Sequence, residues 1–138
     1  MTEPRDVVLR LDDGTETVLV DELGAGRFRL RSFPICSCEK MSLGDVFEAK
    51  QLTDGTLEYI RRIERGHYKK YTYVLSEKLK ESTQLANFLD RVLEMDCHWE
   101  IIFGGLLMIG VPRGVKWNPT EDLDRALQEV GRASDAAP

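Results

Sequence analysis

The chain has 138 residues, of which 42% are apolar and 31% are charged, and this is the composition of an ordinary soluble globular protein. Its formal charge of −5 disfavours a general nucleic-acid binder, because such affinity depends on neutralising phosphates, and it suits a basic protein partner. No apolar run reaches the roughly 20 residues of a membrane span, and the first residues lack the order of a secretory signal. We therefore expect a cytoplasmic protein that does not associate with membranes and keeps its three cysteines reduced.

The first half of the chain consists of short β-forming segments separated by turn signals. Val7, Leu9 and Leu11 alternate with polar residues, and an Asp-Asp-Gly turn follows them. The same pattern of short segments and glycine turns recurs along the chain, and the predicted strands cover residues 7–11, 17–20, 27–31, 46–49, 57–63 and 68–75. Such closely spaced strands predict a small curved β-sheet or barrel over residues 1–67.

The second half contains two predicted helices. Apolar residues between 82 and 93 follow the spacing of an amphipathic helix. The run Asn118-Pro119-Thr120-Glu121 has the residue types of a helix start, and an apolar stripe continues from it to Gly131, where we expect the helix to end. The stripe consists of Leu123, Ala126, Leu127 and Val130. We expect this stripe to face the core.

Between these helices lies the most apolar stretch of the chain, residues 97–112. Gly104-Gly105 divides it into two arms of strand length, residues 97–103 and 106–111, and Gly-Gly suits a tight hairpin in which both residues have positive φ. Because the arms are apolar on both faces, we expect both faces to be covered and Phe103 and Leu107 to be buried.

The predicted fold class is therefore α+β. A β-rich lobe over residues 1–67 precedes a lobe over residues 68–131 with the order β-α-β-β-α. This order is that of a ferredoxin-like unit without its last strand. Residues 132–138 are predicted to form a disordered tail, and the two lobes are expected to pack as one compact body.

Several short motifs resemble those of a family of small bacterial proteins known only as a domain of unknown function. The residues that carry this resemblance are Leu23-Gly24-x-Gly26-Arg27-Phe28-x-Leu30, then Phe33-Pro34, then Leu43-Gly44-Asp45-Val46, and Arg65-Gly66-His67. The resemblance covers most of the chain. It implies no particular activity, substrate or cofactor.

A basic stretch, residues 57–80, is the first candidate for a binding surface. It combines tyrosines with Arg61, Arg62, Arg65, His67, Lys69 and Lys70. Basic and aromatic residues in alternation bind single-stranded nucleic acid on small barrels, so this stretch is the alternative site for nucleic acid or a small ligand. The more ordinary interpretation, which we favour, is a solvated strand face with the tyrosines packed behind it.

Candidates for metal binding and catalysis are weak. Cys36, Cys38, Cys97 and His98 have the ligand types of a zinc site but poor spacing, so we expect no metal and no cofactor. His67 is a possible general base with Asp45 and Glu64 as partners, yet no nucleophile motif accompanies it. We therefore expect a protein that is not an enzyme.

An acidic cluster on the last predicted helix is the leading candidate for a protein-binding surface. Its members are Glu121, Asp122, Asp124 and Glu129. Such a cluster can meet a basic active site of another protein, which suggests the immunity or antitoxin partner of a bacterial toxin. The predicted partner-binding residues are Glu121, Asp124, Glu129, Trp99 and Trp117.

Overall fold

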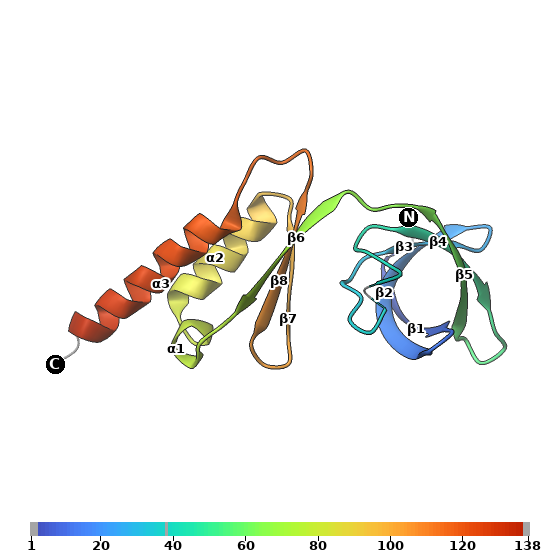
Figure 1. Cartoon of the computed structure of the whole chain (residues 1–138), viewed down its shortest axis with the longest axis horizontal. Coiled ribbons are helices and arrows are strands. Elements are labelled where there is room, and N and C mark those ends of the chain that lie inside the picture. Colours follow the sequence, from blue (N-terminus) through green and yellow to red (C-terminus); the bar gives the residue numbers. More distant parts are fainter. Residues whose placement is uncertain (1–2, 38, 137–138) are drawn as a thin grey trace. The chain divides into compact units, whose positions relative to one another are not determined.

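The computed structural model describes residues 3–37 and 39–136, and the chain divides into two units, each with its own core (Figure 1). The first unit reaches Tyr68 and the second begins at Lys69. The protein is α+β, as predicted, and the first unit is a closed barrel. The boundary between the two lobes was predicted one residue earlier, between residues 67 and 68.

Five strands form the barrel, and they follow one another around it in chain order. They are β1 (Arg5–Leu11), β2 (Gly14–Gly24), β3 (Arg27–Leu30), β4 (Val46–Gln51) and β5 (Leu57–Glu64). Each neighbouring pair is antiparallel, except that β1 pairs with β5 in parallel and so closes the barrel. This parallel closure follows from the odd number of strands, because the first and the last run in the same direction.

The interior of the barrel is filled by the inward residues of each strand. Val7, Leu9 and Leu11 alternate with exposed residues along β1, as the period of two predicts. Phe47 is fully buried at the centre, with its ring centroid 5.8 Å from that of Phe28 and 5.7 Å from that of Tyr59. The barrel therefore encloses a packed core.

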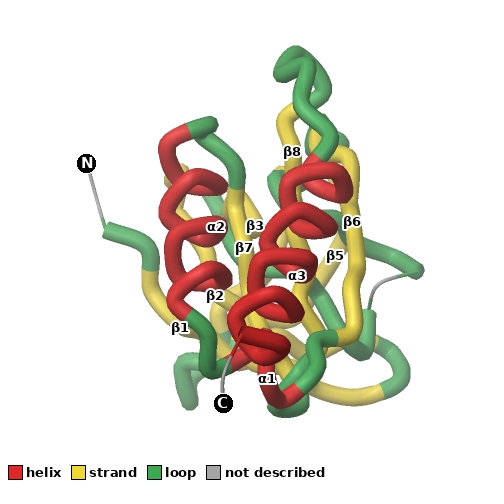
Figure 2. The backbone as a smooth tube through the Cα atoms, turned by 90° about the vertical axis from the view of Figure 1, so that its left-hand side faces the viewer, coloured by secondary structure: helices red, strands yellow, loops and turns green. Residues whose placement is uncertain are grey.

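The second unit contains a three-stranded sheet in the order β6-β8-β7. Its elements are β6 (Tyr68–Val74), α1 (Glu77–Lys80), α2 (Thr83–Glu94), β7 (His98–Ile102), β8 (Leu106–Pro112) and α3 (Pro119–Ala136). The backbone N–H of Leu75, at the end of β6, donates to the carbonyl of Gly105, just before β8 begins (2.8 Å), so these two strands are antiparallel. Figure 2 shows α2 and α3 side by side over one face of this sheet.

α2 and α3 begin where their sequences predict. The hydroxyl of Ser82 accepts the N–H of Leu85 (3.1 Å) and caps α2, whose buried residues are Leu85, Phe88 and Val92. No helix among the residues that the structure describes is long and apolar enough to cross a membrane.

Two predictions about α3 are wrong. The helix continues through Gly131 to Ala136, where a disordered tail was expected, since one glycine costs a helix only about 1 kcal/mol and alanines follow it. Leu127 was expected in the core but is 52% exposed, because the buried side of α3 is narrow and centres on Leu123 and Ala126.

The central hairpin is present, but its turn differs from the prediction. Phe103 and Gly104 have positive φ (52° and 73°), and Gly105 does not, because the N–H of Gly105 bonds the carbonyl of Ile102 and puts residues 103 and 104 at the centre of the turn. Phe103 is consequently 82% exposed at the tip of the hairpin, whereas Leu107 is fully buried. The expected burial of Phe103 is thus wrong.

Replacing Leu107 and Phe103 by aspartate should therefore have opposite outcomes. We expect Leu107→Asp to lower the free energy of unfolding by at least about 3 kcal/mol, since it forces a carboxylate into an apolar core. Phe103→Asp should change it by less than about 0.5 kcal/mol, because the site is exposed and Asp tolerates positive φ. Urea unfolding of both variants checks this, and equal losses would contradict the turn described above.

Candidate functional site

The carboxylate of Asp45 is the most buried charge in the first unit, with 1% of the residue exposed. Its oxygens accept the backbone N–H of Gly66 (2.6 Å), the Nε–H of Arg62 (2.8 Å) and the backbone N–H of Ser42 (2.8 Å). These bonds tie the segment between β3 and β4 to the end of β5. Asp45 therefore acts as a structural clamp, and no hydrogen bond between described residues joins His67 to it.

Two glycines allow the close approach that the clamp requires. A Cβ atom on Gly66 would lie 2.1 Å from the carbonyl oxygen of Leu43, and one on Gly44, whose φ is +86°, would lie 2.8 Å from the ring of Tyr68. The Leu43-Gly44-Asp45 and Arg65-Gly66-His67 segments are thus two halves of one contact. Packing accounts for both glycines without a catalytic role.

Three of the four tyrosines of the basic stretch are partly buried against a core. Tyr59 packs against the barrel core, and Tyr71 and Tyr73 pack against the core of the second unit. Arg61 pairs with Glu48 (3.6 Å) and Arg62 with Asp45; Lys69 lies over the ring of Tyr71 (5.2 Å). The side chains of Arg65, His67 and Lys70 are exposed.

The zinc candidates occupy different surroundings. Cys36 is exposed in the first unit, and Cys38 lies outside the described residues. In the second unit, burial raises the pKa of the Cys97 thiol, with a smaller contribution from the charge of Asp96, and His98 Nε2 contacts Glu100 Oε2 at 2.7 Å. In the part of the chain that the structure describes, no three His, Cys, Asp or Glu residues group as metal ligands.

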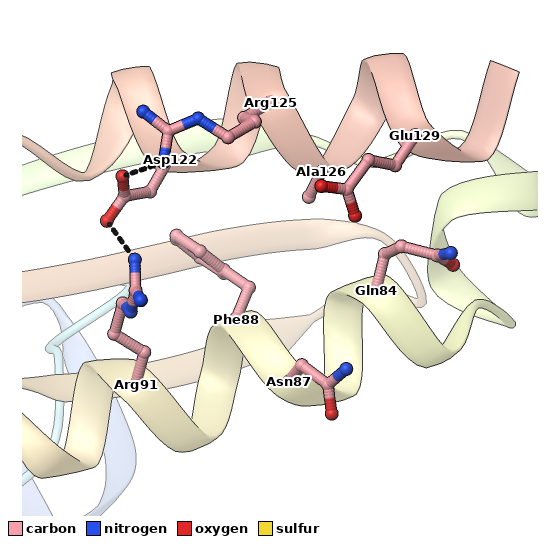
Figure 3. A pocket seen from close by; sticks show the side chains of 8 residues that line it. All are labelled: Gln84, Asn87, Phe88, Arg91, Asp122, Arg125, Ala126 and Glu129. Atoms are coloured by element: carbon pink, nitrogen blue, oxygen red, sulfur yellow. Dashed lines mark hydrogen bonds and ion pairs between the residues drawn. The ribbon is translucent and has the colours of Figure 1, made fainter. Parts of the chain in front are cut away.

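A groove of about 220 Å³ runs between α2 and α3 and is a candidate site (Figure 3). Phe88 of α2 and Ala126 of α3, both buried, form its apolar floor. Polar and charged side chains line the rest: Gln84, Asn87, Arg91, Asp122, Arg125 and Glu129. The sequence pattern identified Asp122 and Glu129 as members of the acidic cluster. It did not identify Gln84, Asn87 and Arg91 of α2 as site residues, although helical spacing places these three on one face.

Asp122 organises one end of this groove. It accepts the indole N–H of Trp117 (2.9 Å) and contacts Arg91 (3.2 Å) and Arg125 (3.4 Å). Burial alone raises the pKa of Asp122, but the hydrogen bonds from Trp117 and Arg91 and the charges of both arginines outweigh it, so the net pKa lies below its ordinary value. Both arginines are thus held at the groove by one carboxylate.

The predicted partner-binding residues divide between surface and core. Glu121, Asp124 and Glu129 are exposed, and Glu129 lines the groove. The two tryptophans are half-buried: Trp99 packs against the core, and Trp117 lies against Phe88 with ring centroids 6.2 Å apart. The acids therefore present charge to solvent, whereas the tryptophans mainly support the second unit.

On the other flank of α3, away from the groove, Asp124 lies near Tyr73 of β6. Burial raises the pKa of Tyr73, and the charge of Asp124 adds to the increase, although a hydrogen bond with Thr120 (2.7 Å) acts against it. The two flanks of α3 thus each carry one exposed acid, Asp124 toward β6 and Glu129 toward α2.

Gly66→Ala should damage the first unit severely. The new methyl group would overlap the backbone of Leu43 and Gly44, which cannot move without breaking the bonds of Asp45, so we expect a loss of more than about 3 kcal/mol in the free energy of unfolding. Gly114→Ala, where no atom lies within 4 Å of the added group, is the control and should be nearly neutral. Thermal unfolding of both variants measures this, and a fully stable Gly66→Ala protein would disprove the close contact.

The lowered pKa of Asp122 predicts a pH-dependent stability. Its stabilising effect is fully present above its unfolded pKa of about 4 and is lost as the pH falls through the lower folded pKa. Asp122→Asn should therefore be less stable than wild type at pH 7, by about 1–3 kcal/mol, and the difference should shrink as the pH drops below about 4. Urea unfolding at several pH values tests this; a difference independent of pH would show that the charge is not involved.

Comparisons with known proteins bear on the fold and leave function open. No protein-family model matches the chain, and a search of curated proteins finds no significant match. The structure is similar to a crystal structure described as a hypothetical protein from Neisseria gonorrhoeae, with a TM-score of 0.52 and 15% sequence identity. This similarity covers 97% of the present chain and 89% of the other, and it extends to the fold alone.

Proposed function

We propose that this chain is a non-enzymatic protein-binding module that presents the acidic surface of α3 to a basic partner. The observation that carries the proposal is the distribution of charge on α3. Glu121, Asp124 and Glu129 are exposed, whereas the two neighbouring arginines, Arg91 and Arg125, are drawn to the more buried Asp122. The net effect is a helix whose outward charge is negative.

The acidic surface would mainly raise the rate at which a basic partner associates with the protein. Complementary charges steer two proteins together before contact, and exposed acids on a rigid helix are suited to this task. An inhibitor that blocks a basic active site needs such a surface. The immunity or antitoxin partner of a bacterial toxin is the specific form of the proposal.

The architecture of the second unit is compatible with this role. We infer a ferredoxin-like unit without its fourth strand, and the strand order β6-β8-β7 with two helices on one face supports that inference. The alternative, binding of single-stranded nucleic acid or a small ligand at residues 59–73, has less support, because Tyr59, Tyr71 and Tyr73 pack partly against the two cores.

The proposal is tested with the purified product of the neighbouring gene as the candidate partner. The variant Glu121→Gln, Asp124→Asn, Glu129→Gln removes charge with little change in shape. The control, Glu3→Gln, Asp6→Asn, Asp13→Asn, removes the same charge from exposed sites in the first unit. We expect the α3 variant to slow association about tenfold at low salt and to leave dissociation almost unchanged, with the control near wild type.

Surface plasmon resonance at two salt concentrations measures both rates. An association rate that is insensitive to the α3 substitutions and to salt would contradict the proposal. Salt-sensitive retention on a single-stranded oligonucleotide column, lost on replacing Arg65 and Lys70 by glutamine, would favour the alternative.

A further inference from the structure

β6 is an edge strand whose outer backbone groups are directed away from the sheet. In the order β6-β8-β7, no described strand lies beyond β6. Backbone groups of successive residues alternate in direction, and the N–H of Leu75 bonds Gly105 beside β8. Tyr73 and Tyr71 therefore direct their backbone groups toward β8, while Thr72 and Val74 direct theirs outward, and Val74 is 86% exposed.

One flank of α3 lies beside this edge. Thr120, Asp124 and Leu127 are spaced by four and three residues, so they share one side of the helix. The hydrogen bond between Thr120 and Tyr73 shows that this side faces β6, and Figure 2 shows α3 with α2 on one side and β6 on the other. Leu127, which is 52% exposed, lies on this side of α3 about two turns beyond Thr120.

We propose that this edge pairs with the β6 edge of a second copy of the chain, in an antiparallel manner about a two-fold axis at Thr72. The outward groups of Thr72 then bond those of Thr72 in the other copy, and Val74 lies opposite Lys70. On the side that the helices cover, Tyr71 lies opposite Tyr73. This pairing joins the two sheets into one of six strands.

The sequence of β6 suits pairing with itself in this register. Threonine opposite threonine and tyrosine opposite tyrosine are favourable cross-strand pairs. No lysine faces a lysine: Lys70 in one copy is four positions from Lys70 in the other, or about 13 Å along the strand, beyond the Debye length of about 8 Å. β6 also contains no proline and no acidic residue, so neither a missing N–H nor acidic repulsion opposes pairing.

A strand edge alone forms a small interface, so side chains beside the strand also have to contribute to it. A seven-residue strand is only about 24 Å long. Stable interfaces bury roughly 1,200–2,000 Å² in total, which is more area than one strand pair of this length provides. Val74, which is 86% exposed on the face away from the helices, adds apolar surface to the contact in both copies. We therefore expect a dimer that dissociates on dilution, and this inference does not depend on the function proposed above.

The first experiment measures sedimentation equilibrium of the full chain over a range of concentrations. Val74→Lys puts a lysine opposite Lys70 of the other copy and should weaken dimerisation at least about tenfold, whereas Val74→Glu creates an opposite-charge pair and should leave it unchanged or stronger. Both substitutions are at an exposed site and should leave the melting temperature unchanged. Val8→Lys, at an exposed valine of the barrel, is the control and should behave as wild type.

The second experiment tests the register by disulfide formation. Paired residues of this kind have Cα atoms about 5.5 Å apart, within the range that a disulfide spans. With Cys36 and Cys38 replaced by serine, Thr72→Cys should form a covalent dimer under mild oxidation, and Val74→Cys should form it at least about tenfold more slowly. A chain that is monomeric at all concentrations, equal effects of Val74→Lys and Val74→Glu, or equal cross-linking at both positions would overturn the proposal.

Discussion

The buried carboxylate of Asp45 is the interaction on which the first unit most depends. The connection between β3 and β4 is long, and Asp45 fastens its end to the end of β5. Asp45 does this with three short hydrogen bonds, to Ser42, Arg62 and Gly66. Because a buried charge is stable only when it is paired and hydrogen-bonded, the glycine that lets the backbone approach is as necessary as the carboxylate itself.

How much was predictable depends on the range of the interactions involved. The barrel, the helix starts and the hairpin arms were predictable because strand alternation, helical spacing and serine caps are local properties of the sequence. The contact of Gly66 with Leu43 was not, since it joins residues far apart in the chain, and a glycine gives the same signal in an ordinary turn. For the same reason the α2–α3 groove was not predicted, because it brings residues of α2 beside Asp122 and Glu129 of α3.

The errors at Phe103 and Leu127 share one physical cause. Hydrophobicity predicts that a residue prefers burial, but a hairpin tip and the flank of a helix are exposed by geometry, whatever residue occupies them. At Phe103 the turn is determined by the bond between Gly105 and Ile102, and Phe103 takes a positive φ that a bulky residue rarely adopts. Contact of such an exposed apolar side chain with water is unfavourable when the chain is free.

A partner of this protein would have to contact the groups that folding leaves uncommitted. Among the described residues, no buried side-chain nitrogen or oxygen lacks a hydrogen-bond partner, so the interior offers no polar group to a ligand. Asp45 and Asp122 are both occupied by arginines, and Tyr59, Tyr71 and Tyr73 pack partly against the two cores. What remains on the second unit is charge on α3 and an open strand edge beside it. The first can attract a partner over a distance, and the second offers directional backbone bonds at contact, so the two surfaces can act in sequence or compete.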